Sequence, residues 1–458
     1  MAAAGLLSVR GFLLLVFLNA VTVSAYRWYN WQFATTCEST RHIVPDDEAD
    51  LAAFVKQQYP QRDSYIISLT NLKNVTIHDN NTVTFGAGWD LVDLIPMLRS
   101  HNLQPLNLGT ERVQNFIGAF TPGTHGTGKN LGNIATHVIG FRVMDATGKI
   151  HKVDHYNQPE ELKAFRISLG ALGLITEVTI QVEPISYLKR TTELIPASPN
   201  FTQLYTDVYD YYQKYDRMMV WGPHMDWDPI NSNWKMESNL TITYWENSTD
   251  TGVYNCSTNY CANGCGDCER PYVCYDVATE AISTPPQGVC SRSFYAEIEH
   301  FFPVEDFVEG ATNYTNFQLS QTPRMKDYNN HQMVYELRFV KGDDTWMSPV
   351  NTYNLGPEHS GIFAVIEIDW YATYNNYGSL WFYQTLAQEF IPEFGHIYNV
   401  HSHWNKMLWF NKTYAEYIYP ELEKFLIIQE RMDPHCQFVN EFLVNSLGIN
   451  RCRGICPP

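Results

Sequence analysis

A glycine-rich loop is the feature that most limits what this chain can fold into. Glycines recur at positions 109, 118, 123, 126, 128 and 132, and the densest stretch reads Thr121-Pro122-Gly123-Thr124-His125-Gly126-Thr127-Gly128. Closely spaced glycines let backbone N–H groups approach an anionic ligand, and a concave run of such amides binds phosphate. The loop lacks the Gly-Lys-Ser/Thr ending of a P-loop, and no Gly-x-Gly-x-x-Gly follows the first expected strand, which disfavours a nicotinamide site. On spacing alone, a surface loop with a structural histidine remains an equal alternative.

Hydrophobic spacing on both sides of this loop predicts an α+β domain over residues 26–185. A helix is expected after Pro45, with Leu51, Phe54 and Val55 on one face, and another over residues 89–101, kinked or shortened by Pro96. Strands are expected at residues 65–69, 82–85, 138–144, 149–153 and 174–183.

The rest of the chain, residues 186–458, predicts a second domain, because 458 residues exceed one ordinary core. Helices are expected at residues 201–216, 304–316, 379–394 and 414–432, and strands at 218–221, 239–245, 293–300, 331–340 and 361–371. This alternation favours a sheet covered by helices on one face.

Several features predict export. Residues 1–25 read as a signal peptide, with Arg10 before an apolar run and a small-x-small ending at Ala25. Asn-x-Ser/Thr sequons begin at Asn74, Asn80, Asn200, Asn239, Asn247, Asn255, Asn313 and Asn411. The net charge of -18 gives no basic face for nucleic acid, and no later stretch predicts a membrane span. We therefore expect a secreted glycoprotein without nucleic-acid or membrane contacts after signal cleavage.

Six of the ten cysteines fall between Cys256 and Cys290, inside a Gly- and Asn-rich insert at residues 247–290. Their spacing suits either zinc or disulfides. In an oxidising compartment thiolates pair with each other, so disulfides are favoured and no metal ligands are assigned.

The order of several segments resembles the FAD domain of vanillyl-alcohol-oxidase-type flavoproteins, and within that group the aldonolactone and alditol oxidases. In the first half of the chain, the segments that resemble the family are residues 106–128, residues 138–148 and the stretch Ser168-Leu169-Gly170-Ala171-Leu172-Gly173-Leu174-Ile175. In the second half, the resembling segments are Tyr335-Glu336-Leu337-Arg338, Asp344-Thr345-Trp346-Met347-Ser348-Pro349 and His403-Trp404-Asn405-Lys406. The resemblance covers most of the chain except the Cys-rich insert.

This resemblance implies an FAD-binding domain followed by a substrate (cap) domain. Noncovalent FAD would contact Thr110, Asn115, Gly118, Pro122, Gly123, Thr124, His125 and, through its backbone, Ile175. Substrate would meet Thr110, Asp369 and His403, with Glu336, Arg338 and Lys406 as the catalytic side chains. Asp369 and Asn405 depart from the alditol oxidase pattern, where a Thr and a Gly stand.

The implied reaction oxidises an alcohol carbon of a sugar lactone or polyol, with O₂ as acceptor and H₂O₂ as product. Lys406 would handle a proton, because a desolvated lysine near a second cation can have a lowered pKa. Arg338 would stabilise negative charge, and Glu336, on the same strand face, would orient it. A dehydrogenase, or another exported sugar or amine oxidase, is the second enzyme interpretation.

The resemblance to the FAD domain is lost between the first expected helix and the strand expected at residues 65–69. Flavoproteins of this type carry a strand and a Gly-rich turn there, whereas this chain has only residues 60–64, without Gly or His. Three explanations stay open: an incomplete isoform, weak FAD binding through the loop of residues 123–128 alone, or a flavin-free, non-enzymatic secreted glycoprotein.

Overall fold

The computed structural model describes residues 26–29, 36–39, 41–59, 65–228, 230–231, 233–251, 256, 271–283, 295–321, 332–371, 389–408 and 411–449. The expected signal peptide, the junction at residues 60–64, most of the Cys-rich insert and residues 379–388 of an expected helix lie outside them. Within the described chain no helix combines the length and apolarity that a membrane crossing needs.

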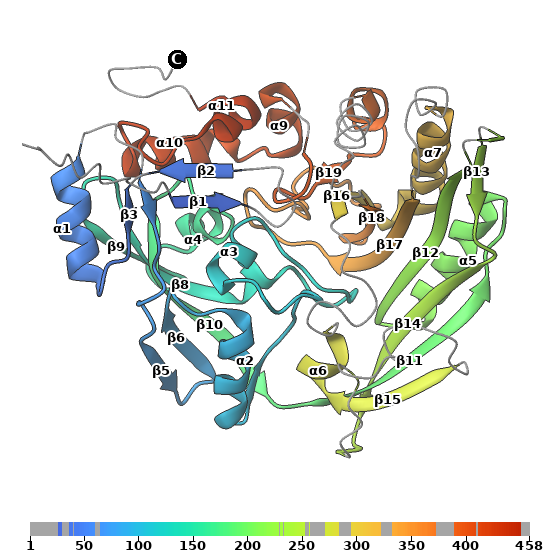
Figure 1. Cartoon of the computed structure of the whole chain (residues 1–458), viewed down its shortest axis with the longest axis horizontal. Helices are drawn as coiled ribbons and strands as arrows, with labels where there is room; N and C mark the ends of the chain where they lie inside the picture. The colour runs from blue at the N-terminus through green and yellow to red at the C-terminus, as the bar shows by residue number, and fades with distance from the viewer. Residues whose placement is uncertain are drawn as a thin grey trace, which may run out of the picture.

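The first half of the chain forms a six-stranded sheet with the order β5-β6-β10-β8-β9, and β7 pairs with β10 (Figure 1). Its strands are β5 (Val75–His78), β6 (Thr82–Gly86), β7 (Leu103–Pro105), β8 (Val138–Met144), β9 (Ile150–Asp154) and β10 (Leu174–Pro184). The helices are α1 (Glu48–Gln58), α2 (Leu91–Ser100), α3 (Phe116–Phe120) and α4 (Pro159–Arg166), with a 3₁₀ turn, η1, at Ile134–His137. Two short pairs, β1 (Tyr26–Tyr29) with β2 (Thr36–Ser39) and β3 (His42–Ile43) with β4 (Ile66–Ile67), stand apart from this sheet.

An N-terminal cap explains where α1 begins, and a buried apolar face explains why α2 forms. Asp47 caps α1, since its carboxylate accepts a hydrogen bond from the Asp50 N–H at 2.8 Å. In α2 the apolar side chains at helical spacing are buried, and Pro96 is tolerated in a helix of 10 residues. Both helices were expected from the sequence.

The rest of the described chain forms a nine-stranded sheet with the order β15-β11-β14-β12-β17-β18-β16-β19, and β13 pairs with β12. The strands are β11 (Tyr187–Pro196), β12 (Arg217–Asp228), β13 (Asn233–Met236), β14 (Asn239–Ser248), β15 (Tyr272–Val277), β16 (Tyr295–Pro303), β17 (Gln332–Lys341), β18 (Ile362–Tyr371) and β19 (His401–Ser402). The helical elements are α5 (Phe201–Lys214), α6 (Ala278–Ile282), η2 (Val304–Asp306), α7 (Phe307–Ser320), α9 (Lys412–Ile418), α10 (Leu422–Met432) and α11 (Glu441–Leu447).

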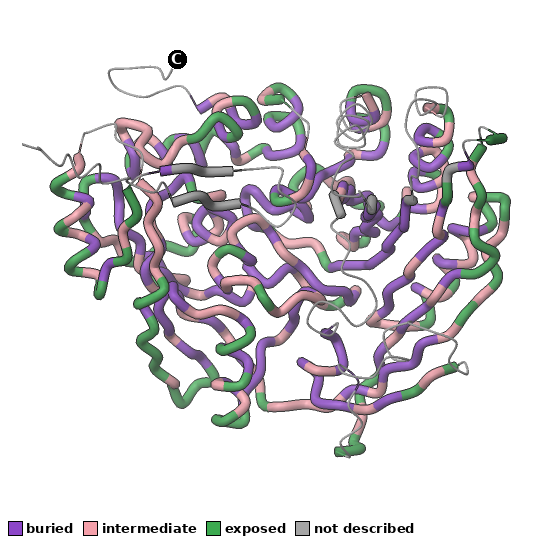
Figure 2. Tube along the Cα trace, in the orientation of Figure 1, coloured by how far each residue is buried: buried purple, intermediate pink, exposed green. Residues whose placement is uncertain are grey.

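The two faces of this sheet have different partners. Leu337, Ile366 and Ile368 belong to the buried core together with residues of α5 and α7, and the Tyr205 hydroxyl lies 2.6 Å from that of Thr315 between those two helices. Because successive strand residues point to opposite faces, the intervening side chains face away from α5 and α7. Buried positions run along β16, β17 and β18, where the sheet meets the rest of the molecule (Figure 2).

The α+β fold class is confirmed, with specific differences in the elements. The single helix expected over residues 414–432 is wrong: α9 ends at Ile418 and α10 begins at Leu422, because Pro420 interrupts the helical hydrogen bonds. The sequence also missed β11 and α4. In β11 charged residues interrupt the apolar pattern, yet Arg190 is 3% exposed and lies over the Trp245 ring.

Candidate active site

Three neighbouring strands bring six charged side chains to the face of the large sheet that points away from α5 and α7. Glu299 of β16 is opposite Glu367 of β18, and Glu367 is opposite Glu336 of β17. The remaining three lie two positions along the same strands, and the alternation of strand side chains places all six on one face: Glu297, Glu299, Glu336, Arg338, Glu367 and Asp369.

Two cations bind this row of carboxylates. The Arg338 guanidinium forms an ion pair with Glu336 and lies 3.3 Å from Glu367 Oε2. The Lys406 ammonium lies 2.9 Å from Glu367 Oε1 and forms a second ion pair with Glu297. Glu367 therefore accepts contacts from both cations and sits at the centre of the network.

The glycine-rich loop of the first domain closes over this network. His125 Nε2 lies 2.8 Å from Glu299 Oε1, and both side chains are 2% exposed. The Gly128 N–H donates to the Phe339 carbonyl of β17 at 2.6 Å, and the Thr127 hydroxyl donates to the Met218 carbonyl of β12. The loop is thus attached by backbone and side chain to the same sheet that carries the charged residues.

His403 lies beside the loop and is held neutral. Its ring centre is 6.0 Å from that of His125, and its Nδ1 accepts the Asn405 N–H at 3.1 Å. Burial lowers the pKa of His403 to about 3, so the ring carries no charge at neutral pH. It can accept or donate a hydrogen bond without adding positive charge.

Burial also sets the protonation of the carboxyl groups. It raises the pKa of Glu336 to about 7 against the opposing effect of Arg338, and the pKa of Glu297 to about 7 against that of Lys406. Burial and the Glu367 charge raise the pKa of Asp369 well above its usual range. For Glu299, the raising effect of burial is outweighed by His125, and its pKa is lowered.

The expectation that Lys406 has a lowered pKa is wrong. Burial does act in that direction, but the charges of Glu297 and Glu367 outweigh it, and the pKa of Lys406 is raised well above its usual value. Lys406 is therefore a permanent cation that donates hydrogen bonds. Among the site residues, Glu336 is better suited to accept a proton at neutral pH.

Two protein families match separate parts of the chain. The family described as FAD binding domain matches residues 49–154, and the family described as D-arabinono-1,4-lactone oxidase matches residues 312–446. The chain is 25% identical to L-gulonolactone oxidase of Mus musculus over 399 residues, which cover 83% of this chain and 85% of that protein. The chain thus combines an FAD binding domain with a domain of the D-arabinono-1,4-lactone oxidase family, and its relatives include aldonolactone oxidases.

Other relatives and structures agree with this family. L-gulono-1,4-lactone dehydrogenase of Mycobacterium tuberculosis is 30% identical over 183 residues, which cover 36% of this chain and only 42% of that protein. Cholesterol oxidase from Brevibacterium sterolicum has the same fold, with a TM-score of 0.67 and 13% identity over 93% of this chain and 97% of the other. Glucooligosaccharide oxidase from Acremonium strictum gives a TM-score of 0.59 with 12% identity, over 89% and 91% of the two chains.

In this aldonolactone oxidase relative, several residues of the expected FAD site have structural contacts of their own. Asn115 caps α3 by accepting the Ile117 N–H at 3.0 Å and donates to the Ala87 carbonyl at 2.9 Å. Gly123 has a φ of +95°, and a Cβ there would lie 2.8 Å from Pro349 Cδ. The expected set occupies one loop and one adjoining strand: Thr110, Asn115, Gly118, Pro122, Gly123, Thr124 and His125 lie between β7 and η1, and Ile175 lies in β10 paired with Val143 of β8.

Two glycines leave room for a flavin next to this loop. A Cβ at Gly118 would meet nothing nearer than Asn115 Cβ at 4.0 Å, and a Cβ at Gly170 would meet nothing within 4 Å. The Leu169 N–H donates to the Thr121 carbonyl at 3.4 Å, so the two segments are in contact. Both glycines are exposed, so this side of the loop has room for a ligand, and the family match over residues 49–154 names FAD as the ligand of this part of the chain.

Sequence reasoning missed Glu297, Glu299 and Glu367. A signal was present, because each lies in an expected strand where an acidic residue alternates with apolar ones, as in Glu367-Ile368-Asp369. Such alternation usually marks a solvated face. Here the face is covered by the loop that carries His125, and no property of the strand alone reveals that cover.

The expected disulfide chemistry is visible in part of the Cys-rich region. Cys256 is bonded to Cys274 of β15, and the pair lies in a small buried cluster with Trp245 and residues of α6. Cys436 is also disulfide-bonded. The other cysteines between Cys256 and Cys290, and the junction at residues 60–64, lie outside the described residues.

Proposed function

We propose that this chain is an FAD-dependent oxidoreductase that oxidises an alcohol carbon of a sugar lactone or a polyol. The observation that carries the proposal is the row of buried Glu336, Arg338 and Glu367, with the half-buried Lys406 paired to it, beneath the glycine-rich loop. Such a row provides both a proton acceptor and fixed positive charge, which are what alcohol oxidation needs from the protein.

Glu336 is the proposed proton acceptor. With its pKa raised to about 7 by burial, its carboxyl is close to half ionised at neutral pH and can take the proton of a substrate hydroxyl. The neighbouring Arg338 remains charged in both states and holds the Glu336 carboxylate through their ion pair. Arg338 thereby orients the base and stabilises negative charge that develops on the substrate oxygen.

Lys406 is proposed to position the substrate. Its ammonium is fixed between Glu297 and Glu367, so its remaining hydrogen can be donated to a hydroxyl or carbonyl oxygen. His403, which is neutral, and Asp369 extend the same polar surface. A row of acceptors and donors on one sheet face suits a ligand with several hydroxyl groups.

The isoalloxazine ring supplies the redox chemistry when FAD is bound, by accepting the hydride of the alcohol carbon. The proposed terminal acceptor is O₂, which takes two electrons and two protons to give H₂O₂. The mycobacterial relative is named a dehydrogenase and the mouse relative an oxidase, so both classes of acceptor occur among proteins similar to this chain.

We also propose that the protein is secreted and N-glycosylated, and that the signal peptide is residues 1–25. Supporting observations are the Cys256–Cys274 disulfide and the exposure of the sequon side chains Asn74, Asn80, Asn200, Asn239, Asn247 and Asn411. Asn313 is half-buried and donates to the Tyr398 hydroxyl, so it is the poorest acceptor of the described sequons.

The direct test is to purify the secreted chain, record its absorption spectrum before and after FAD addition, and measure turnover on a panel of lactones, polyols and amines. An oxidase predicts flavin bands and peroxide formation with lactones or polyols. Activity with an artificial dye but not with O₂ would assign a dehydrogenase. A protein that stays colourless after FAD addition would contradict the proposal and favour the flavin-free alternative.

A further inference from the structure

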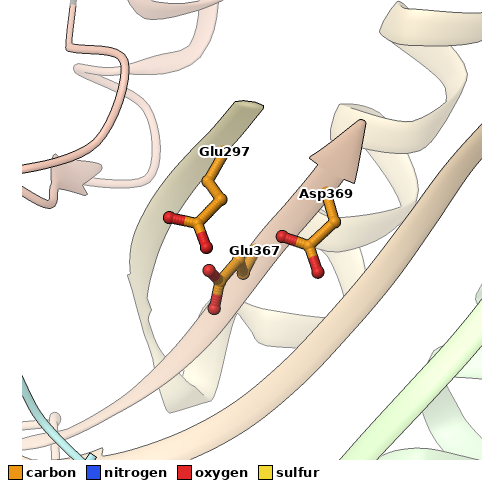
Figure 3. Close-up of side chains that lie close together, drawn as sticks. All are labelled: Glu297, Glu367 and Asp369. Atoms are coloured by element: carbon orange, nitrogen blue, oxygen red, sulfur yellow. The ribbon is translucent and has the colours of Figure 1, made fainter. Parts of the chain in front are cut away.

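Three carboxylates of the site converge on one point. Glu297 of β16 is directly opposite Asp369 of β18, and Glu367 lies two positions before Asp369 on the same face. Their carboxylate groups point toward one another (Figure 3), and one oxygen from each lies within 4.8 Å of the others. This spacing allows a single ion to contact all three.

Negative charge exceeds positive charge on this face. Five carboxylates share it, from Glu297, Glu299, Glu336, Glu367 and Asp369, whereas the permanent cations there are Arg338 and Lys406. The face therefore carries three more carboxyl groups than permanent cations, and a bound cation would replace the protons that otherwise neutralise them.

Asp369 is the residue that the known cations do not reach. It is 3% exposed, and its Oδ1 has no hydrogen-bond partner in the described part of the chain. The ion pairs of Lys406 go to Glu297 and Glu367, and those of Arg338 go to Glu336 and Glu367. A buried carboxyl oxygen without a partner is costly, so this atom is expected to carry a proton or to bind a group outside the described residues.

We propose that Glu297, Glu367 and Asp369 bind a divalent metal ion, with Ca²⁺ as the best match. All the donors are carboxylate oxygens, which favour hard cations over Zn²⁺ or Cu²⁺. Ca²⁺ accepts irregular geometry and bidentate carboxylates, whereas Mg²⁺ needs near-octahedral geometry and keeps several waters. The crowded, buried position therefore suits Ca²⁺ better than Mg²⁺.

A bound ion would share two of its ligands with the cations already present. The Lys406 ammonium contacts Oε2 of Glu297 and Oε1 of Glu367, and Arg338 lies 3.3 Å from Oε2 of Glu367, whereas neither cation forms an ion pair with Asp369 among the described residues. The inference is independent of the proposed oxidase function, because cation binding needs neither flavin nor turnover.

The test is calorimetric titration of the purified full-length chain, first stripped with a chelator, with CaCl₂, MnCl₂ and MgCl₂ at pH 8. The expected result is one Ca²⁺ per chain, with weaker binding of Mg²⁺. Asp369→Asn and Glu297→Gln should each weaken Ca²⁺ binding at least tenfold. The exposed Glu160→Gln is the matched control and should bind as the unmodified chain does.

Circular dichroism in chelator distinguishes loss of a ligand from loss of the fold. If Asp369→Asn does not fold, Glu297→Gln and the stoichiometry of the unmodified chain carry the test. Absence of heat and of a thermal shift for the unmodified chain at millimolar Ca²⁺ would overturn the proposal. Equal Ca²⁺ affinity of the folded Asp369→Asn variant would overturn it as well.

Discussion

His125 and Glu299 form a buried hydrogen-bonded pair that joins the glycine-rich loop to the nine-stranded sheet. His125 Nε2 and Glu299 Oε1 are 2.8 Å apart, although the residues are 174 positions apart in the sequence. The second ring nitrogen, Nδ1, lies 2.8 Å from the Gly126 carbonyl, so both nitrogens of the ring have partners. The glycine-rich loop is therefore fixed to β16 by the same histidine that lies nearest to the charged row.

The first prediction is that His125→Ala destabilises the whole protein. Truncation would leave the Glu299 carboxylate buried without its partner, and breaking a buried pair in this way costs about 3–5 kcal/mol. Chemical denaturation measured by tryptophan fluorescence should show this loss of unfolding free energy. His101→Ala, at an exposed position after α2, is the control and should be close to neutral. A loss of unfolding free energy for His125→Ala no larger than that of the control would show that the pair does not stabilise the fold.

The second prediction concerns the charge of Lys406. Lys406→Met should reduce turnover on the order of 100-fold, because a fixed donor near the reacting oxygen is lost. Lys406→Arg keeps the charge near Glu297 and Glu367 and should recover part of the rate. Steady-state kinetics of both variants provide the measurement. If Lys406 acted as a proton acceptor instead, the permanently charged arginine would recover nothing.

The third prediction uses a separate, half-buried acid, Asp343. Its Oδ2 accepts hydrogen bonds from Asn133 of the first domain at 2.6 Å and from Ser348 at 2.9 Å. Burial raises the pKa of Asp343 from 3.8 to about 7. Between these values the folded chain holds a proton that the unfolded chain releases, so this stabilisation is complete below pH 3.8 and is lost as pH rises through 7.

Thermal unfolding from pH 4 to pH 8 tests this sign. Asp343→Asn cannot ionise, so its melting temperature should rise relative to the unmodified chain as the pH increases. Asp344→Asn, at the exposed neighbouring position, should show no such trend. Parallel curves for Asp343→Asn and the unmodified chain would mean that folding does not raise the pKa of Asp343.

Much of this fold could be predicted because the local patterns agree with the final structure. The apolar alternation at residues 361–371 became β18, Ile362–Tyr371, and the capped helix after Asp47 became α1. The pattern failed where tertiary contacts override it. Arg190 of β11 is buried because its guanidinium packs on the Trp245 ring. No sequence pattern within the strand predicts a buried arginine.

The candidate site was predicted by resemblance for Glu336, Arg338 and Lys406, which the structure brings together. Their electrostatic state could not be predicted, because it depends on Glu297 and Glu367 from other strands. The single observation that Lys406 contacts both carboxylates reverses the expected direction of its pKa. The direction of such a pKa shift depends on the distances between side chains of different strands, and these distances cannot be obtained from the sequence.

The fourth prediction is the pH dependence of the reaction. If Glu336 accepts the substrate proton, kcat/KM should rise with pH and level off above an apparent pKa near 7, the value to which burial raises the Glu336 carboxyl. Glu336→Gln should lose this rising limb and about 100-fold or more of the rate. The assay is run in chelator to keep divalent ions away. Retention of the rising limb in Glu336→Gln would assign the base to another group, with Glu297 the next candidate.

The fifth prediction compares two glycines of the same loop. Gly123→Ala should cost about 1–2 kcal/mol of stability, because φ is +95° and the new Cβ would lie 2.8 Å from Pro349 Cδ. Gly118→Ala should leave stability unchanged or raise it by about 0.5–1 kcal/mol, because it is an exposed helical position with open space around it. If the space at Gly118 belongs to the flavin, this neutral substitution should weaken FAD binding at least tenfold. Fluorescence titration with FAD, beside thermal unfolding of both variants, separates the two effects. Normal FAD affinity in Gly118→Ala would place the flavin elsewhere along the loop.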